Sequence, residues 1–221
     1  MGDKMGAQEN LNTLWAWLPY LAEGFLLNVL ISVMAMFLGT VLGWWLGVAR
    51  AGQVKVLRFA STGLTSLLRN IPSFVFMFYI AFVTPVEFEW DGALIAIPAW
   101  IKAVVALTIP VVGFCSDQVD ILINAQQRKA AHAFATFAVA WTQYLLVIIM
   151  ASATASVIGV DEIVGRANTV IAAVGEPSLI LWVYGFVALW FLASGLVFSQ
   201  SLRYARYRLH DKRGHMRLEE G

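Results

Sequence analysis

Charged residues are scarce in this chain of 221 residues: 13% are charged and 60% are hydrophobic, and the mean hydropathy is +0.73. An average soluble domain is about 25% charged, so this chain has too few polar side chains to cover a globule in water. A soluble enzyme, a disordered chain and a free nucleic-acid binder are therefore excluded as first interpretations. The composition predicts an integral membrane protein.

Residues for chemistry are also scarce. The single cysteine, Cys115, excludes an internal disulfide and a cysteine-based metal cluster. The sequence contains no glycine-rich phosphate-binding loop with its lysine, so we expect no ATP hydrolysis by this chain itself. It also lacks a Ser/His/Asp set and a pair of carboxylates placed for hydrolysis. We expect no enzymatic activity, no metal and no nucleic-acid partner.

What the sequence does contain is long apolar runs. A helix that crosses a hydrocarbon core of about 30 Å needs roughly 20 apolar residues, and backbone groups in lipid must bond within the segment. We expect an all-α integral membrane protein whose transmembrane helices cover residues 23–49, 60–84, 98–122, 138–158 and 179–202. Residues 1–22 would form an outer or interfacial segment, about 159–178 an outer loop, and 203–221 a basic tail.

Basic residues indicate the orientation, because loops rich in Lys and Arg stay in the cytoplasm. Eleven of the fifteen basic residues follow the first, third and fifth predicted spans: Arg50, Lys55, Arg58, Arg128, Lys129, Arg203, Arg206, Arg208, Lys212, Arg213 and Arg217. The opposite loops are mainly acidic. The N-terminus is therefore expected outside and the C-terminus inside. The tail is predicted either to bind anionic lipid or to act as a stop signal with a solvated end.

Several residues within the spans have two interpretations. Gly39, Gly43 and Gly47 recur every fourth residue, which allows close helix packing either with another subunit or gate or within the same bundle. Pro72 and Pro110 predict either broken helices that line a substrate path or simple kinks.

We also make predictions for three other sets of polar residues. Asp117 and Asp120 share a helix face near the inner end of the third span, where they either line a cavity or reach the headgroups. His132 is expected to be a solvated interfacial histidine. Glu162 and Arg166 are expected to form an i, i+4 pair on one helix.

Two segments resemble a known family. Residues 156–170 (SVIGVDEIVGRANTV) resemble the outer loop before the last helix in ABC-transporter permeases of the polar amino acid family, and 69–75 (RNIPSFV) resemble the start of that family's second helix. Residues 17–24 (WLPYLAEG) and the run from Ala106 to Asp117 also fit. The resemblance implies a five-helix permease of the type I importer fold. It would pack with a second permease above a cytoplasmic ATPase dimer that binds ATP and Mg²⁺, and would receive an amino acid from a periplasmic binding protein.

The segment that resembles the family's coupling helix departs from the usual pattern. The family has Glu-Ala-Ala followed by a glycine and a Leu-Pro, whereas this chain has Lys129, Ala130, Ala131, His132 and, at the glycine position, Ala135. The Leu-Pro is missing, and part of the usual pattern is absent before Gln143. We expect this degenerate loop, at about 126–137, to leave the main ATPase contact to an intact permease partner in a heterodimer.

The resemblance implies a function in amino acid import across the bacterial inner membrane. In this chain, residues Met150–Thr154 replace the Lys-Asp-Thr-Ser run that is usual in the family, so the charged pair of that run is absent. The residues expected to line the path, or to make ordinary interhelical hydrogen bonds, are these: Asn70, Pro72, Ser116, Asp117, Ser152, Thr154 and Ser156. The alternatives are a permease-derived scaffold that does not transport and, less favoured because five spans are few, a stand-alone channel or secondary transporter.

Overall fold

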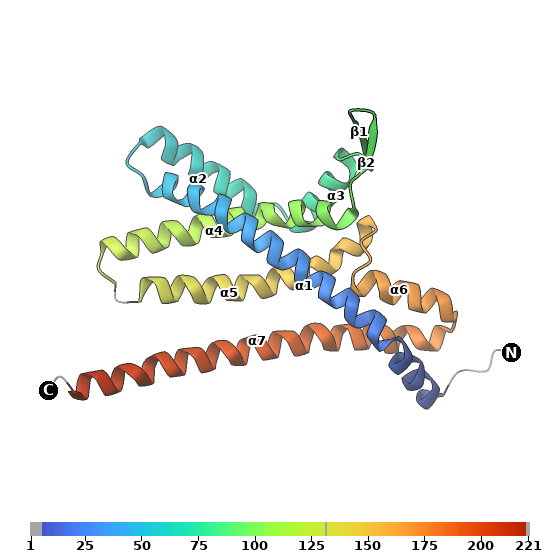
Figure 1. Ribbon diagram of the computed structural model, residues 1–221. Helices are drawn as coiled ribbons and strands as arrows, with labels where there is room; N and C mark the ends of the chain where they lie inside the picture. Colours follow the sequence, from blue (N-terminus) through green and yellow to red (C-terminus); the bar gives the residue numbers. More distant parts are fainter. Residues whose placement is uncertain (1–5, 131, 220–221) are drawn as a thin grey trace.

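The structure is a computed structural model that describes residues 6–130 and 132–219, except for the side chains of Trp90 and of residues 201–219. It is largely helical, with one short hairpin (Figure 1). The elements in chain order are α1 (Ala7–Ala51), α2 (Lys55–Asn70), α3 (Ser73–Val83), β1 (Glu87–Trp90), β2 (Ala93–Ala96), α4 (Ala99–Gln127), α5 (Ala133–Ser152), the 3₁₀ helix η1 (Ala153–Ile158), α6 (Ile163–Val174) and α7 (Pro177–Glu219).

Helices α1 and α4 form the centre of the bundle. The predicted glycine stripe of α1 lies against α4 of the same chain: a Cβ atom on Gly39, Gly43 or Gly47 would come within 2.4–2.6 Å of the side chain of Val111, Cys115 or Val119 respectively. Both sets recur every fourth residue, so they meet in register along the two helices. Small residues at these positions allow the backbones to approach closely.

The second predicted span is not one straight helix. Residues 60–84 fall on α2 and α3, which meet at a bend of 93°. Ile71 has an extended backbone (φ −86°, ψ 125°), and Pro72 precedes the first residue of α3. Proline carries no N–H group and restricts the residue before it to extended conformations, so the helix stops and restarts here. Pro110, in contrast, lies inside the continuous helix α4.

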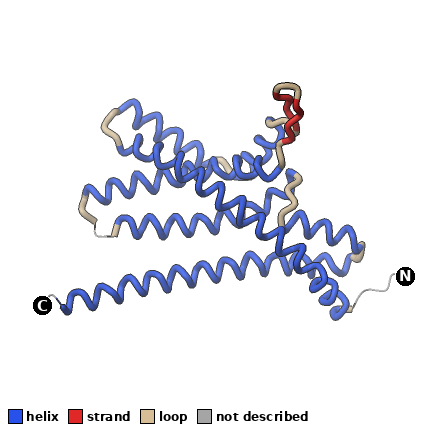
Figure 2. The backbone as a smooth tube through the Cα atoms, viewed as in Figure 1, coloured by secondary structure: helices blue, strands red, loops and turns tan. Residues whose placement is uncertain are grey.

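The prediction of an all-α chain was wrong in one segment. Residues 87–96 form an antiparallel hairpin in which Glu87 pairs with Ala96 and Trp90 with Ala93, shown as the red strands of Figure 2. The two-residue turn is Asp91-Gly92, with φ of 50° and 79°. An Asp-Gly pair tolerates two positive φ values and closes a tight hairpin.

By length and apolar composition, the described residues contain four helices that could cross a membrane, or five if α2 and α3 together make one broken span. Helix α1 begins well before the predicted start of the first span, and α7 continues to Glu219 beyond the predicted end of the fifth. The start of α1 and the end of α7 lie at opposite ends of the bundle (Figure 1). The α1–α2 and α4–α5 connections lie at the same end as the end of α7.

Candidate functional site

The strongest concentration of charge within the helices is a cluster, called here the ion cluster, of Arg50, Arg69, Asp117 and Asp120. The Asp117 carboxylate on α4 pairs with two guanidinium groups, Arg50 from the end of α1 and Arg69 from the last turn of α2. The Nε atom of Arg50 also lies 3.6 Å from Oδ2 of Asp120. Two positive and two negative side chains therefore join three helices, so the two aspartates do not face an open cavity as isolated acids.

A polar contact lies beside the ion cluster, between α2 and α4. The hydroxyl groups of Thr65 and Ser116 are 2.8 Å apart, and both side chains are buried. Among the described residues, α2 fully buries two side chains, Ser61 and Thr65, and both are polar. The buried positions of α2 are therefore polar, and Leu68 is half-buried beside Gly113 of α4. The other large apolar residues of α2 are exposed: Val56, Leu57, Phe59, Leu64 and Leu67.

Four of the predicted path residues lie in this region. Ser116 and Asp117 lie between α2 and α4, as described, and Pro72 lies at the break between α2 and α3. Asn70 is the last residue of α2 and is exposed; its amide donates to Ser66 Oγ at 3.1 Å. The structure therefore brings these residues together around the broken span.

The other three predicted path residues lie at the end of α5 and in η1. The hydroxyl groups of Ser152, Thr154 and Ser156 each donate to a backbone carbonyl three residues earlier, at 2.7–3.1 Å. A hydroxyl that bonds its own helix in this way still has acceptor capacity. Ser152 uses this capacity to accept a hydrogen bond from the Asn28 amide at 2.9 Å.

The sequence did not predict the centre of this second group, Glu162. Its side chain has no exposed surface, and it caps the N-terminus of α6 by accepting from the backbone N–H groups of Val164 and Gly165 at 3.0 and 3.1 Å. The Asn28 amide also donates to it, at 2.9 Å. The capping pattern of an acidic residue directly before an apolar helix was a signal for this role.

Burial dominates the electrostatics of Glu162. Desolvation raises the pKa of its carboxyl above the ordinary value, and the hydrogen bonds from Val164, Asn28 and Gly165 oppose that effect. Both oxygens of this buried carboxyl group accept hydrogen bonds, so its polar atoms are satisfied despite their burial.

The predicted pair of Glu162 with Arg166 was wrong. Arg166 turns away from Glu162 and instead binds Glu23 at 2.8 Å and Asp161 at 3.2 Å. It also donates to the Tyr20 carbonyl at 2.7 Å and lies over the Tyr20 ring. Because Glu162 serves as the cap of α6, its carboxylate points back at the helix N-terminus and not along the helix surface.

The segment expected to contact an ATPase is a tight turn between α4 and α5. Lys129 adopts φ 56°, and the N–H groups of Lys129 and Ala130 bond back to the carbonyls of Gln126 and Ala125. This is the Schellman arrangement that ends a helix. Ala135 already belongs to α5, and Ala131 lies outside the described residues. The residues described here therefore form a helix end and a helix start, with no separate coupling helix.

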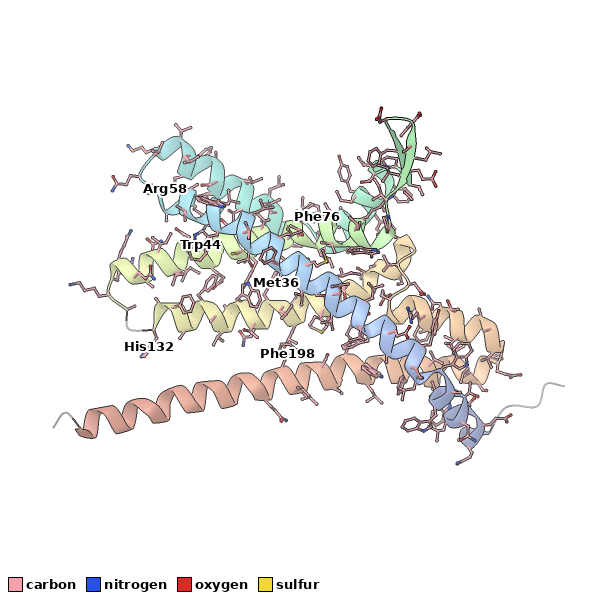
Figure 3. The ribbon with its side chains drawn as sticks, viewed as in Figure 1. Met36, Trp44, Arg58, Phe76, His132 and Phe198 are labelled. Atoms are coloured by element: carbon pink, nitrogen blue, oxygen red, sulfur yellow. The ribbon has the colours of Figure 1, made fainter. Side chains whose placement is uncertain are left out.

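A cavity of about 250 Å³ opens beside this turn, between α4 and α5. His132, labelled in Figure 3 at the start of α5, lines it together with mainly apolar side chains such as Ile121 and Phe137. In the part of the chain that the structure describes, no group of three or more His, Cys, Asp or Glu side chains is arranged to hold a metal ion.

The chain is similar in sequence to a known permease and in fold to solved transporter structures. No family model matches the chain. The probable amino-acid ABC transporter permease protein YckA of Bacillus subtilis (strain 168) is 34% identical over 67 residues. That match spans 30% of this chain and 30% of the relative's length.

The fold is shared with chains of two solved amino acid transporters. A chain from the crystal structure of an amino acid ABC transporter with histidines superposes with a TM-score of 0.66 at 15% identity, over 86% of this chain and 96% of that chain. A chain from inward-facing conformations of the MetNI methionine ABC transporter gives 0.61 at 18% identity, over 85% and 97%. The predicted resemblance to amino acid ABC-transporter permeases is confirmed, and the structural similarity shows the fold.

Proposed function

We propose that this chain is the transmembrane permease subunit of an ATP-driven importer that carries an amino acid across the bacterial inner membrane. The observation that supports this most directly is the shared fold, which extends over 96% of a chain of a solved amino acid ABC transporter. The sequence match to a probable amino-acid permease supports the same substrate class.

The proposed arrangement in the membrane has five crossings, with α2 and α3 as one broken crossing. Its support is that the start of α1 and the end of α7 lie at opposite ends of the bundle, as an odd number of crossings requires (Figure 1). The basic residues of the α1–α2 and α4–α5 connections lie at the end where α7 finishes. By the positive-inside rule this end faces the cytoplasm and the N-terminus faces the periplasm.

The proposed partners are a second permease subunit, a cytoplasmic ABC ATPase dimer and a periplasmic amino acid-binding protein. The chain has no phosphate-binding loop, so ATP and Mg²⁺ would be bound by the ATPase subunits. The turn from Arg128 to His132 is too short to hold a coupling helix of its own. We therefore propose a heterodimer in which an intact permease supplies the main ATPase contact, while Lys129, Ala130 and Ala135 add a minor one.

The proposed substrate path follows the polar buried positions of α2 and the break between α2 and α3. Asn70, Pro72, Ser116 and Asp117 lie around it, and η1, which follows Ser152 and carries Thr154 and Ser156, contacts α3. Polar side chains that face the inside of a bundle usually mark a route for polar solutes.

Composition and transport can be tested together. The full chain with an affinity tag, extracted in mild detergent from its own bacterium, should yield by native mass spectrometry one copy of this chain, one different permease and two ATPase subunits. A stoichiometric ATPase retained by this chain without a second permease would contradict the heterodimer.

Radiolabelled amino acid uptake should fall when the gene is deleted. Unchanged uptake of every amino acid would contradict import and favour the non-transporting scaffold.

A further inference from the structure

The broken span is attached to α4 on both sides of its break. On the outer side, the Lys102 ammonium donates to the carbonyl of Thr84, the C-cap residue directly after α3, at 3.0 Å. On the inner side, Arg69, which lies two residues before Ile71, pairs with Asp117 of α4. At a rise of 1.5 Å per residue, Lys102 and Asp117 lie about 22 Å apart along α4. The residues at the break, Ile71 and Pro72, therefore lie in the chain between these two attachments.

The two attachments differ in their access to water. Lys102 is 7% exposed, whereas the Arg69 side chain is 54% exposed. An ion pair with a half-exposed partner contributes little to stability and exchanges readily with water. The contact of α2 with α4 also includes the buried Thr65 hydroxyl and the side chain of Leu68, which packs beside Gly113 but is only half-buried. Separating α2 from α4 would therefore expose little fully buried apolar surface.

Asp117 has a second cationic partner, and this makes the inner attachment reversible. If Arg69 leaves, Asp117 still pairs with Arg50, so no carboxylate is left alone among the helices. Removing the last partner of a buried charge would be far more costly. Arg50 is also the less exposed of the two arginines, with 23% of its side chain accessible.

From these contacts we infer that Arg69 and Asp117 form a reversible latch, and that α2 swings away from α4 about Ile71 and Pro72 during transport while α3 stays attached. The hinge is available because Pro72 has no N–H group to continue the helical hydrogen bonds. Arg69 and Asp117 are positioning residues here. This inference rests on the proposed transport function.

A disulfide across the α2–α4 contact tests the latch in the complete transporter complex in membrane vesicles. The side-chain oxygens of Thr65 and Ser116 are 2.8 Å apart, so Thr65→Cys with Ser116→Cys, in a Cys115→Ala background, should cross-link on oxidation. We expect oxidation to lower amino acid uptake by the double variant at least tenfold and dithiothreitol to restore it, while uptake by the Thr65→Cys variant does not change on oxidation. Full uptake with complete cross-linking would overturn the latch and leave the proposed function standing. If neither the wild-type vesicles nor the Cys115→Ala vesicles take up any amino acid, that result would contradict the proposed function instead.

A second measurement needs no transport. Ser116 is buried, so in the Cys115→Ala background Ser116→Cys should react slowly with a water-soluble thiol reagent in the assembled complex. Arg69→Gln weakens the latch and should raise this rate several-fold. The matched control is Arg58→Gln on the same helix, labelled in Figure 3, which lies outside the ion cluster and should leave the rate unchanged. Equal rates in the Arg69→Gln and Arg58→Gln variants would overturn the latch.

Discussion

The side-chain amide of Asn28 on α1 donates to the carboxylate of Glu162 at the start of α6, at 2.9 Å and across 134 positions of sequence. The Asn28 carbonyl oxygen in turn accepts the backbone N–H of Ile163 at 3.1 Å. One buried side chain thus binds both the cap of α6 and its first N–H group. Because the same amide also reaches Ser152, Asn28 fixes the segment after α5 against α1.

Glu162→Gln should destabilise the protein. The groups around the carboxylate are donors: the amide of Asn28 and the N–H groups of Val164 and Gly165. A glutamine replaces one accepting oxygen with an NH₂ group and leaves a buried donor without an acceptor, which costs about 1–3 kcal/mol. Thermal unfolding of the purified complex should show a lower midpoint. Glu87→Gln, an equivalent change on the exposed hairpin, is the control and should leave the midpoint unchanged; equal midpoints for both variants would contradict this role of Glu162.

The stability that Glu162 contributes should depend on pH. Burial raises the pKa of this carboxyl, so the folded protein binds the proton more tightly than the unfolded chain does. Its contribution to the free energy of unfolding should therefore be largest below the ordinary glutamate pKa, decrease as the pH rises to the raised value, and stay constant above it. The measurement is the difference in unfolding free energy between wild type and Glu162→Gln across this range. A difference that instead grows with pH would mean that the hydrogen bonds outweigh burial.

The parts of the fold that could be predicted are those set by a single local property. Residues 98–122 and 138–158 were expected to be spans, and α4 and α5 with η1 cover them, because an apolar run of that length must be helical in lipid. The break in the second span was harder, since a proline can either kink or end a helix. At Pro72 the helix ends, whereas at Pro110 it continues.

The contacts that define the candidate site could not be predicted, because they join residues that are distant in the sequence. The spacing of Asp117 and Asp120 showed that they share a face but not that Arg50 and Arg69 would neutralise them. The spacing of Glu162 and Arg166 suggested a local pair, yet tertiary partners compete more strongly for both side chains. The Asp91-Gly92 turn, in contrast, is a local hairpin signal in the sequence, because both residues tolerate a positive φ.

Gly43→Ala should disrupt the contact between α1 and α4. The added Cβ would lie 2.6 Å from the Cβ of Cys115 and 2.7 Å from the backbone oxygen of Val112, which cannot rotate away. Overpacking of this kind typically costs about 1–3 kcal/mol. Gly185→Ala on α7 is the matched control, since its Cβ would meet nothing within 4 Å. Thermal unfolding should show a lower midpoint for Gly43→Ala and an equal or higher one for Gly185→Ala; similar midpoints would contradict the close approach of the two helices.

Cys115 should report the same contact from the other helix. Its side chain has no exposed surface, and its thiol donates weakly to the Thr40 carbonyl of α1 at 3.5 Å. A thiol reagent should therefore label the folded protein very slowly and the denatured protein fully. Because Gly43→Ala forces α1 and α4 apart beside this thiol, that variant should be labelled several times faster than wild type, and Gly185→Ala should not. Rapid labelling of Cys115 in the wild type would show that the two helices separate in the native protein, and the glycine stripe would then be a moving contact rather than a fixed one.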